Sequence, residues 1–211
     1  MNKRAIIERH NPVLTEISTD SPLSVGNGEF CYTADITGMQ TLYAHYENAH
    51  FPLCTMSNWG WHTAPASGGR VYEWSDLELT AYEHAGRTVH YPVEKKPGNE
   101  EVYDWLRHNP HKFNLGRIGL CLDNCEIPPE SLKNIQQKLD LYTGTLTSRF
   151  TLEGEDVEVI TICDPYSDTI AFKIKSRHPQ IGVKLAFPYG NHEISGSNWE
   201  NPGKHTTAWH D

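Results

Sequence analysis

Two tryptophans flank a glycine and precede a histidine in the stretch Trp59-Gly60-Trp61-His62. Gly60 leaves the backbone too free to favour a helix or a strand core, so the spacing predicts a shaped loop. An indole offers a large flat apolar face with one N–H at its rim, which suits stacking on the C–H face of a sugar ring, on a base or on another protein. The alternative is that Trp59 and Trp61 plug the open end of a core, since Trp is usually well buried.

Twelve histidines raise the hypothesis of a metal site. A catalytic zinc needs about three converging protein ligands, and a zinc protease places two histidines four residues apart on a helix with a Glu between them. The close histidine pairs lack that pattern; they are His45 with His50, His108 with His111, and His205 with His210. Cys121 and Cys125 also lack the C-x-x-C spacing of a redox or zinc site. The sequence therefore predicts no metal and no other cofactor.

Other catalytic motifs are absent from the sequence. No Gly-x-Ser-x-Gly elbow occurs, Cys54 has no flanking signature, and Gly26-Asn27-Gly28 is not followed by the glycine and lysine of a phosphate-binding loop. Glycoside hydrolysis would need an acid and a base about 5 to 10 Å apart. No sequence rule selects such a pair among the many acids, which include Asp35, Glu47, Asp104, Asp140, Asp164 and Asp168. We therefore predict no catalytic residue. Asp164 and Asp168 are expected to bond backbone amides of a turn.

The bulk composition describes a turn-rich globular chain. Its 211 residues suit one large domain or two small ones. The net charge is -9 and the basic residues are scattered, so nucleic acid is an unexpected partner. No run approaches the roughly 18 apolar residues of a membrane span. Five cysteines and a start without an apolar signal region indicate free thiols in the cytoplasm. A periplasmic or secreted location is the alternative if Met1 replaces a removed signal peptide.

The elements that must position these residues are mostly strands. Alternating or β-rich patterns predict strands at residues 30–34, 115–122, 137–152, 156–163, 169–176 and 182–189. Residues 153–156 read as a hairpin tip, and Asn27-Gly28 as a tight turn. Residues 39–42 are expected to run back beside 30–34, and 206–209 to open a further strand. Consecutive strands joined by short turns predict an all-β, antiparallel sandwich.

Helices and irregular segments complete the prediction. One short helix is expected within residues 1–10 and another at 100–108, where Val102, Trp105 and Leu106 share a face. Residues 43–98 are irregular and rich in aromatic, glycine and proline residues, with isolated strands such as 87–93. A long, weakly periodic stretch of this kind is usually functional or wraps the core.

Four segments in order resemble the opening of the six-hairpin glycosidases, the group that includes maltose and kojibiose phosphorylases and inverting α-fucosidases. The likeness is strongest to uncharacterised glycoside hydrolases of that group. The segments are 21–41 (SPLSVGNGEF, then TADITGMQT), 59–62 (WGWH), 105–120 (WLRHNPH, then LGRIGL) and 139–144 (LDLYTG). The resemblance covers most of the chain.

The resemblance implies a β-supersandwich of the galactose-mutarotase type with one or two short helices. It implies that residues 1–211 are a single N-terminal domain of a longer protein whose (α/α)6 barrel carries the catalytic residues. The partners implied are a carbohydrate and that C-terminal barrel. Whether the chain forms a homo-oligomer stays open. Residues expected to approach the sugar or the barrel are Trp59, Trp61, His62, Arg107 and Arg117. For both arginines, bonding to loop carbonyls or to a neighbouring acid is the alternative.

Three functions follow from these expectations. The first is a non-catalytic accessory domain of a glycoside hydrolase or phosphorylase, which walls part of the sugar pocket. The second is a self-sufficient carbohydrate-binding module that uses the same indoles as a platform. The third is an aldose epimerase, which would need a histidine and a glutamate for acid–base work in one cleft. Fold alone does not choose among them.

Overall fold

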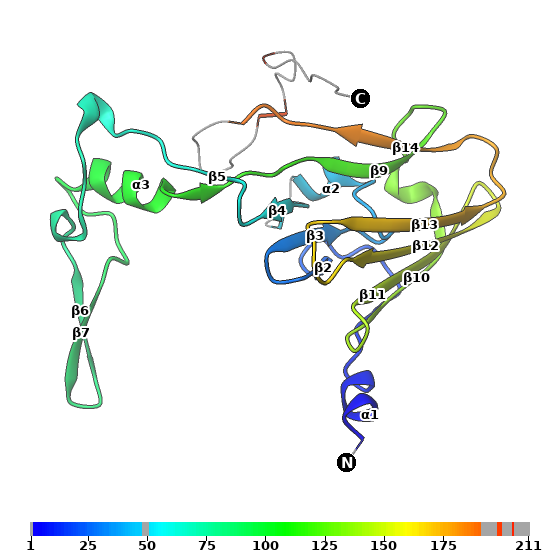
Figure 1. The fold of residues 1–211 in the computed structure, drawn as a ribbon, viewed down its shortest axis with the longest axis horizontal. Coiled ribbons are helices and arrows are strands. Elements are labelled where there is room, and N and C mark those ends of the chain that lie inside the picture. The colour runs from blue at the N-terminus through cyan, green and yellow to red at the C-terminus, as the bar shows by residue number, and fades with distance from the viewer. Residues whose placement is uncertain (1, 48–50, 191–197, 200–203, 205–211) are drawn as a thin grey trace.

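The chain folds into an all-β structure in which the strands pair antiparallel, as the sequence predicts. A computed structural model describes residues 2–47, 51–190, 198, 199 and 204. Figure 1 shows two regions, a body of stacked sheets and a thinner arm that projects from it. We define the arm as residues 61–112 and the body as the other described residues. The predicted strand at 206–209, and also His50, His205 and His210, lie outside the described residues.

The largest sheet of the body has five strands in the order β1-β10-β11-β12-β13. Their bounds are β1 Val13–Leu14, β10 Leu132–Asp140, β11 Thr145–Leu152, β12 Glu155–Cys163 and β13 Ile170–Ser176. Every second side chain of β11 is buried, which gives the sheet one core face. Glu153 and Gly154 have φ angles of 50° and 87°, the left-handed backbone that a tight two-residue hairpin requires, and this confirms the predicted tip.

The expectation of one strand across 137–152 was wrong. The chain turns between β10 and β11, where Gly144 has a φ of 66° and its N–H donates to the Asp140 carbonyl at 2.8 Å. A strand pattern continues through this turn in the sequence because Leu139 and Leu146, on either side of it, face the same core cluster. Alternation of apolar residues alone therefore did not reveal the hairpin.

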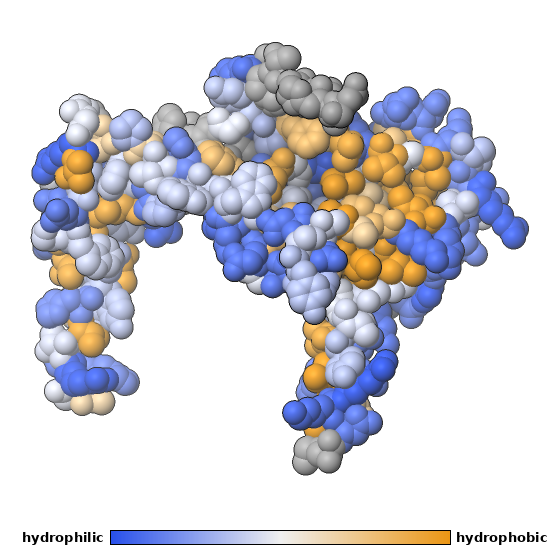
Figure 2. Space-filling view, in the orientation of Figure 1, coloured by the Kyte–Doolittle hydropathy of each residue, from blue (hydrophilic) through white to orange (hydrophobic). Residues whose placement is uncertain are grey.

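A second layer packs on the large sheet. It contains a three-stranded sheet and a two-stranded ribbon, with bounds β2 Leu23–Gly26, β3 Phe30–Ala34, β4 Thr55–Ser57, β9 Arg117–Leu122 and β14 Ile181–Ala186. The main core lies between the layers and joins Met39 and Leu120 to Phe150, Leu152 and Val159. The arrangement is a sandwich. In Figure 2, apolar surface gathers on the body over the region between β14 and β13.

Residues 39–42 do not form the predicted returning strand. The Asp35 carboxylate accepts hydrogen bonds from the Thr37 N–H at 2.8 Å and from the Leu42 N–H at 2.6 Å, so the chain closes into a buried turn. Gln137 donates its side-chain N–H to the Asp35 carbonyl at 2.7 Å and ties that turn to β10. Because Asp35 is fully buried, desolvation raises its pKa to about 6, although these hydrogen bonds oppose the shift.

Short helices occupy the remaining ends and corners of the fold. The predicted helix in residues 1–10 is α1 (Lys3–Glu8), capped by the Asn2 side chain, and the second predicted helix is α3 (Glu100–His108). A third, α2 (Tyr43–Glu47), was not predicted. The 3-10 turns are η1 (Ser67–Gly69), η2 (Trp74–Asp76) and η3 (Pro129–Ser131). None of the helices in the described part of the chain is long and apolar enough to cross a membrane.

The arm begins and ends in one short ladder. Strand β5 (Trp61–His62) pairs with β8 (His111–Lys112) at its base. Beyond them, β6 (Thr80–His84) and β7 (Arg87–Tyr91) form a hairpin, which places a strand within the predicted 87–93 segment. A small core beside α3 joins Ala66, Tyr72, Leu77 and Val102. The irregular stretch of the sequence is therefore mostly this projecting arm (Figure 1).

Candidate functional site

The Trp59 and Trp61 indoles are exposed where the arm leaves the body. Residues 57–60 make a turn in which the Gly60 N–H donates to the Ser57 carbonyl at 3.2 Å. A Cβ on Gly60 would come within 2.8 Å of the Leu115 side chain, so a glycine fits closely there. Trp59 is 68% exposed and Trp61 is 56% exposed. The indoles therefore do not plug a core.

An aspartate from a distant turn holds the Trp59 ring. The Trp59 indole N–H donates to Asp168 Oδ2 at 3.0 Å, and the buried Ser57 hydroxyl donates to the same oxygen. Asp164 accepts from the Tyr166 backbone N–H at 2.8 Å, as expected. The expectation that Asp168 would also bond a backbone amide was wrong, because its carboxylate is taken by these two side chains.

The Gly26-Asn27-Gly28 turn supports that aspartate. The Asn27 side-chain oxygen accepts from the Phe30 N–H at 2.8 Å, which closes the predicted tight turn. Its amide nitrogen donates to the Asp164 carbonyl at 3.1 Å and to the Ser167 carbonyl at 3.0 Å. Asn27 therefore clamps the turn that carries Asp168. The Gly26-Asn27-Gly28 motif therefore has a structural role, because it holds the turn whose Asp168 bonds to the Trp59 indole.

Polar side chains are hydrogen-bonded to one another at the turn that carries Trp59. Lys112 on β8 donates to the Asn58 side-chain oxygen at 2.7 Å and to the Ser57 carbonyl at 3.3 Å. Asn58 donates its amide N–H to the Glu29 carboxylate. An ammonium, an amide and a carboxylate are thus joined by hydrogen bonds, and they include the residue before Trp59 and the residue opposite Trp61. We call Glu29, Asn58, Trp59, Trp61 and Lys112 the indole face.

Trp61 and His62 belong to strand β5, so the predicted loop covers only the turn before them. Trp61 is opposite Lys112 and His62 is opposite His111. Trp61, Pro110, His111 and Lys112 line a shallow pocket of about 280 Å³. The Trp61 indole therefore lines a shallow pocket, whereas the Trp59 indole lies on the open surface.

His62 packs among aromatic rings. Its ring lies 5.8 Å from that of His111 and stacks on Phe113 with centroids 5.7 Å apart. The His111 ring is itself fixed by a 2.8 Å hydrogen bond to the His108 carbonyl. The His62 ring is therefore held in a small aromatic cluster with His111 and Phe113. Across the described residues, no three His, Cys, Asp or Glu side chains cluster in a way that could hold a metal ion.

The two predicted arginines lie apart from the indole face. Arg107 is exposed at the end of α3 and makes no hydrogen bond or ion pair with any described residue. Arg117 begins β9, is only 7% exposed, and bonds to the Glu47 carboxylate. Glu47 is therefore the neighbouring acid that was expected as the alternative partner of Arg117.

Arg117 lines a second and larger pocket of about 470 Å³, the Arg117 pocket. Its charged and aromatic lining includes Tyr43, Glu47, Glu126, Lys184 and Trp199. These residues come from α2, from the segment after β9, from β14 and from the chain beyond it. These residues were not predicted to form one site, because nothing in their sequence spacing indicates that they lie together.

Comparison with protein-family models and with curated proteins found no match. The resemblance to six-hairpin glycosidases thus stays a prediction from the sequence segments.

Proposed function

We propose that this chain is the non-catalytic β-sandwich domain of a carbohydrate-active enzyme, a glycoside hydrolase or phosphorylase. In this role the indole face contacts a saccharide beside a helical catalytic barrel. The observation that carries the proposal is the pair of exposed indoles, one anchored by Asp168 and the other by the β5–β8 ladder. A rigid exposed indole suits the C–H face of a sugar ring, since little conformational entropy is lost on binding.

The polar groups of the indole face support a saccharide as the ligand. Sugar hydroxyls both donate and accept hydrogen bonds, so they match a surface with groups of both kinds. Lys112 and Asn58 supply N–H donors, while Glu29 supplies a carboxylate acceptor. The arrangement combines apolar stacking with polar contacts at the ring edge, the usual composition of a small-molecule site.

A partner domain is favoured by an apolar strand surface on the body. Val183 and Leu185 on β14 point to the same side as Leu120 and Ile118 on β9, yet both are about half exposed. Contiguous exposed apolar surface marks interaction sites more often than free surface. Such a surface agrees with a barrel, or a second copy, that packs against this side of the sandwich.

Two carboxylates, Glu29 in the indole face and Asp168 behind Trp59, favour a contact role over catalysis. Asp168 Oδ2 accepts hydrogen bonds from Ser57 and Trp59, so this oxygen positions the indole. Glu29 accepts from Asn58 at the outer edge. Glycoside hydrolysis requires an acid and a base that flank one bond. Among the described residues of this face, no two carboxylates point into a shared cleft.

A self-sufficient carbohydrate-binding module is the second candidate, because the indoles are already positioned within this chain. The epimerase alternative is less favoured: His178 Nε2 and Glu153 Oε2 lie 3.1 Å apart, but neither residue lines the Trp61 pocket or the Arg117 pocket. The Trp61 pocket contains His111 without a glutamate, and the Arg117 pocket contains Glu47 and Glu126 without a histidine, among the lining residues that the structure describes.

The test is a kinetic comparison in the full-length enzyme that the proposal implies. The W59A/W61A double variant should lower kcat/KM for oligosaccharides roughly tenfold, as expected for the loss of two aromatic contacts. W74A is the matched control, since Trp74 is 63% exposed but lies in η2, outside the indole face. Calorimetry with the isolated chain separates the candidates: binding that W59A/W61A abolishes identifies a module. Wild-type behaviour of the double variant in both assays would refute carbohydrate contact.

A further inference from the structure

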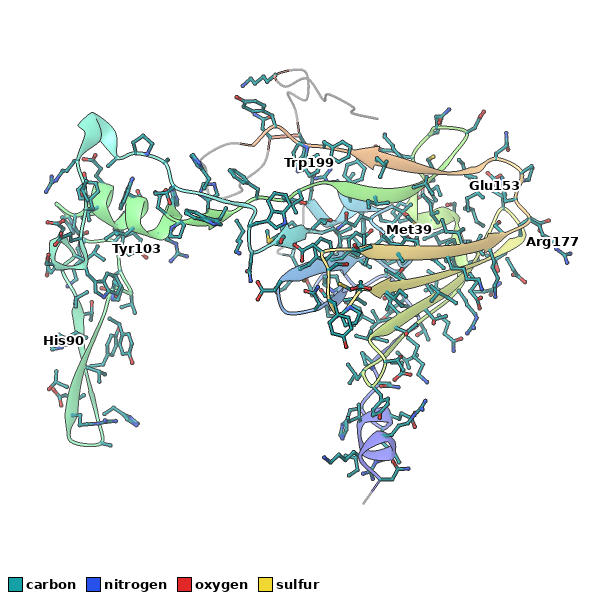
Figure 3. All side chains as sticks on the ribbon, in the orientation of Figure 1. Met39, His90, Tyr103, Glu153, Arg177 and Trp199 are labelled. Atoms are coloured by element: carbon teal, nitrogen blue, oxygen red, sulfur yellow. The ribbon has the colours of Figure 1, made fainter. Side chains whose placement is uncertain are left out.

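The Arg117 guanidinium lies between two aromatic rings in the Arg117 pocket. Its central carbon is 4.2 Å from the ring centroid of Tyr43 on α2 and 3.5 Å from that of Trp199. Figure 3 shows Trp199 beside the end of β14. Because a guanidinium stacks well on aromatic faces, this geometry fixes the arginine side chain.

One donor of this arginine has no acceptor within the described chain. Arg117 Nη2 bonds to Glu47, whereas Arg117 Nε is fully buried and has no hydrogen-bond partner among the described residues. An unpaired buried N–H is costly, so such a group indicates an acceptor beyond the described residues. The Arg117 side chain also lines the pocket.

The lining of the pocket carries further polar groups. Tyr43 donates its hydroxyl hydrogen to the Glu126 carboxylate, which raises the pKa of Tyr43 to about 12 and keeps the hydroxyl protonated. Lys184 on β14 lies opposite Gly119 on β9, is exposed, and forms no ion pair with any described residue. The pocket therefore offers two cations and two carboxylates, which balance in charge.

We propose that the Arg117 pocket binds one neutral monosaccharide unit. Hydroxyl groups accept from Arg117 and Lys184 and donate to Glu47 and Glu126, while the ring face lies against an aromatic side chain. The volume of about 470 Å³ is in the range of small-molecule sites. The choice of a sugar rests on the proposed carbohydrate function.

The occupied guanidinium favours a hydroxyl over a carboxylate ligand. A carboxylate is best held by two parallel N–H donors of an arginine. Glu47 already bonds to Nη2 and Nε is buried, so the Nε–Nη2 edge of the Arg117 guanidinium is not free to hold a ligand carboxylate. The nearby Glu47 and Glu126 carboxylates would also repel an anion.

The experiment is an NMR titration of the purified chain with glucose, galactose and mannose, and in parallel with glycine and with adenosine. At least one hexose should bind, and K184M and E126Q should each weaken binding about tenfold, the loss of one charge-assisted hydrogen bond. Both residues are exposed, so the fold should persist; K173M, an exposed lysine on β13, is the control and should bind normally.

Other outcomes overturn the inference in distinct ways. No hexose binding, binding insensitive to K184M and E126Q, or binding of glycine or adenosine in place of a hexose refutes the sugar site. The W59A/W61A variant should bind hexose as the wild type does. If no hexose binds in the Arg117 pocket while W59A/W61A lowers the activity of the enzyme, the indole-face proposal stands. If hexose binds here and W59A/W61A has no effect, only the indole-face proposal fails.

Discussion

The body and the arm differ in how their apolar side chains are buried. The main cluster of the body contains twelve buried residues among those described, between two sheet layers. The arm has a cluster of four beside α3, and the β6–β7 hairpin has no buried residue on either face. An isolated two-stranded hairpin is at best marginally stable in water. The body therefore determines global stability, and the arm depends on its own small core and on its attachment.

The base of the arm is held closed by side chains as well as by the β5–β8 ladder. The Asn109 side-chain oxygen accepts from the Ala64 N–H at 2.7 Å, and the Trp105 indole N–H donates to the Ala64 carbonyl at 3.0 Å. The indole face lies at this junction, since Asp168 of the body holds Trp59 and β8 of the arm pairs with Trp61. A saccharide bound there would touch both regions.

The largest expected effect comes from the core of the body. Leu152 is fully buried, and Leu152→Ala should lower the free energy of unfolding by roughly 4 kcal/mol, the sum of lost burial and a residual cavity. Urea denaturation should show one destabilised transition. Leu141→Ala, at an exposed turn position, is the control and should change little. A loss below about 1 kcal/mol for Leu152→Ala would contradict a body-centred core.

The second effect is a pH dependence that originates in the body. The pKa of Asp35 is raised from 3.8 to about 6 in the folded protein. At pH values below the pKa of Asp35 in the unfolded chain, protonated Asp35 makes its full contribution to the free energy of unfolding. This contribution is lost as pH rises through about 6. It amounts to about 3 kcal/mol.

Asparagine at position 35 isolates this contribution. The free energy of unfolding of the wild type relative to Asp35→Asn should decline between about pH 4 and 7, because only the wild type titrates at this position. Urea denaturation at several pH values measures it. A difference that stays constant or rises with pH would show that Asp35 is not the buried titrating group.

A third, smaller effect should be confined to the arm. Val102 is buried beside Tyr72 and Leu77, and Val102→Ala should cost about 1 to 2 kcal/mol. Hydrogen exchange should accelerate in α3 and the β6–β7 hairpin while β11 and β12 keep wild-type protection, because regions with separate cores open separately. Equal acceleration in the body would show that the two regions unfold as one unit.

The smallest effect on stability should come from the junction. Asp168→Asn replaces a carboxylate acceptor by a neutral amide, and charge-assisted hydrogen bonds are roughly twice as strong as neutral ones. We expect a loss below about 1 kcal/mol in unfolding free energy, together with faster exchange of the Trp59 indole N–H by NMR. The Trp61 indole serves as the internal reference. Unchanged exchange at Trp59 would remove Asp168 as its anchor.

The body was more predictable from the sequence than the arm. Its strands alternate in burial, as in β3 and β11, so period-2 patterns found them and the all-β class. The predicted strand at 39–42 failed because the Asp35 side chain takes the hydrogen bonds that a ladder would use. In the arm, β6 and β7 are exposed on both faces, so alternation could indicate only part of that hairpin.

The indole face was more predictable from the sequence than the Arg117 pocket. The indoles of the indole face are neighbours in the sequence, and their residue types predict an exposed stacking surface. Asp168 was identified only as a turn residue, because no local pattern reports a hydrogen bond to Trp59. The Arg117 pocket is assembled from segments far apart in the chain, so only Arg117 was selected beforehand.

Oxidative footprinting of tryptophan tests contact at the indole face most directly. The full-length enzyme that the proposal implies is oxidised with and without an oligosaccharide, and mass spectrometry reports the modification of each tryptophan. Trp59 and Trp61 should be protected severalfold, while Trp74, similarly exposed but in η2 outside the indole face, should be oxidised as before. Equal oxidation of Trp59 and Trp61 with and without saturating saccharide would contradict the account.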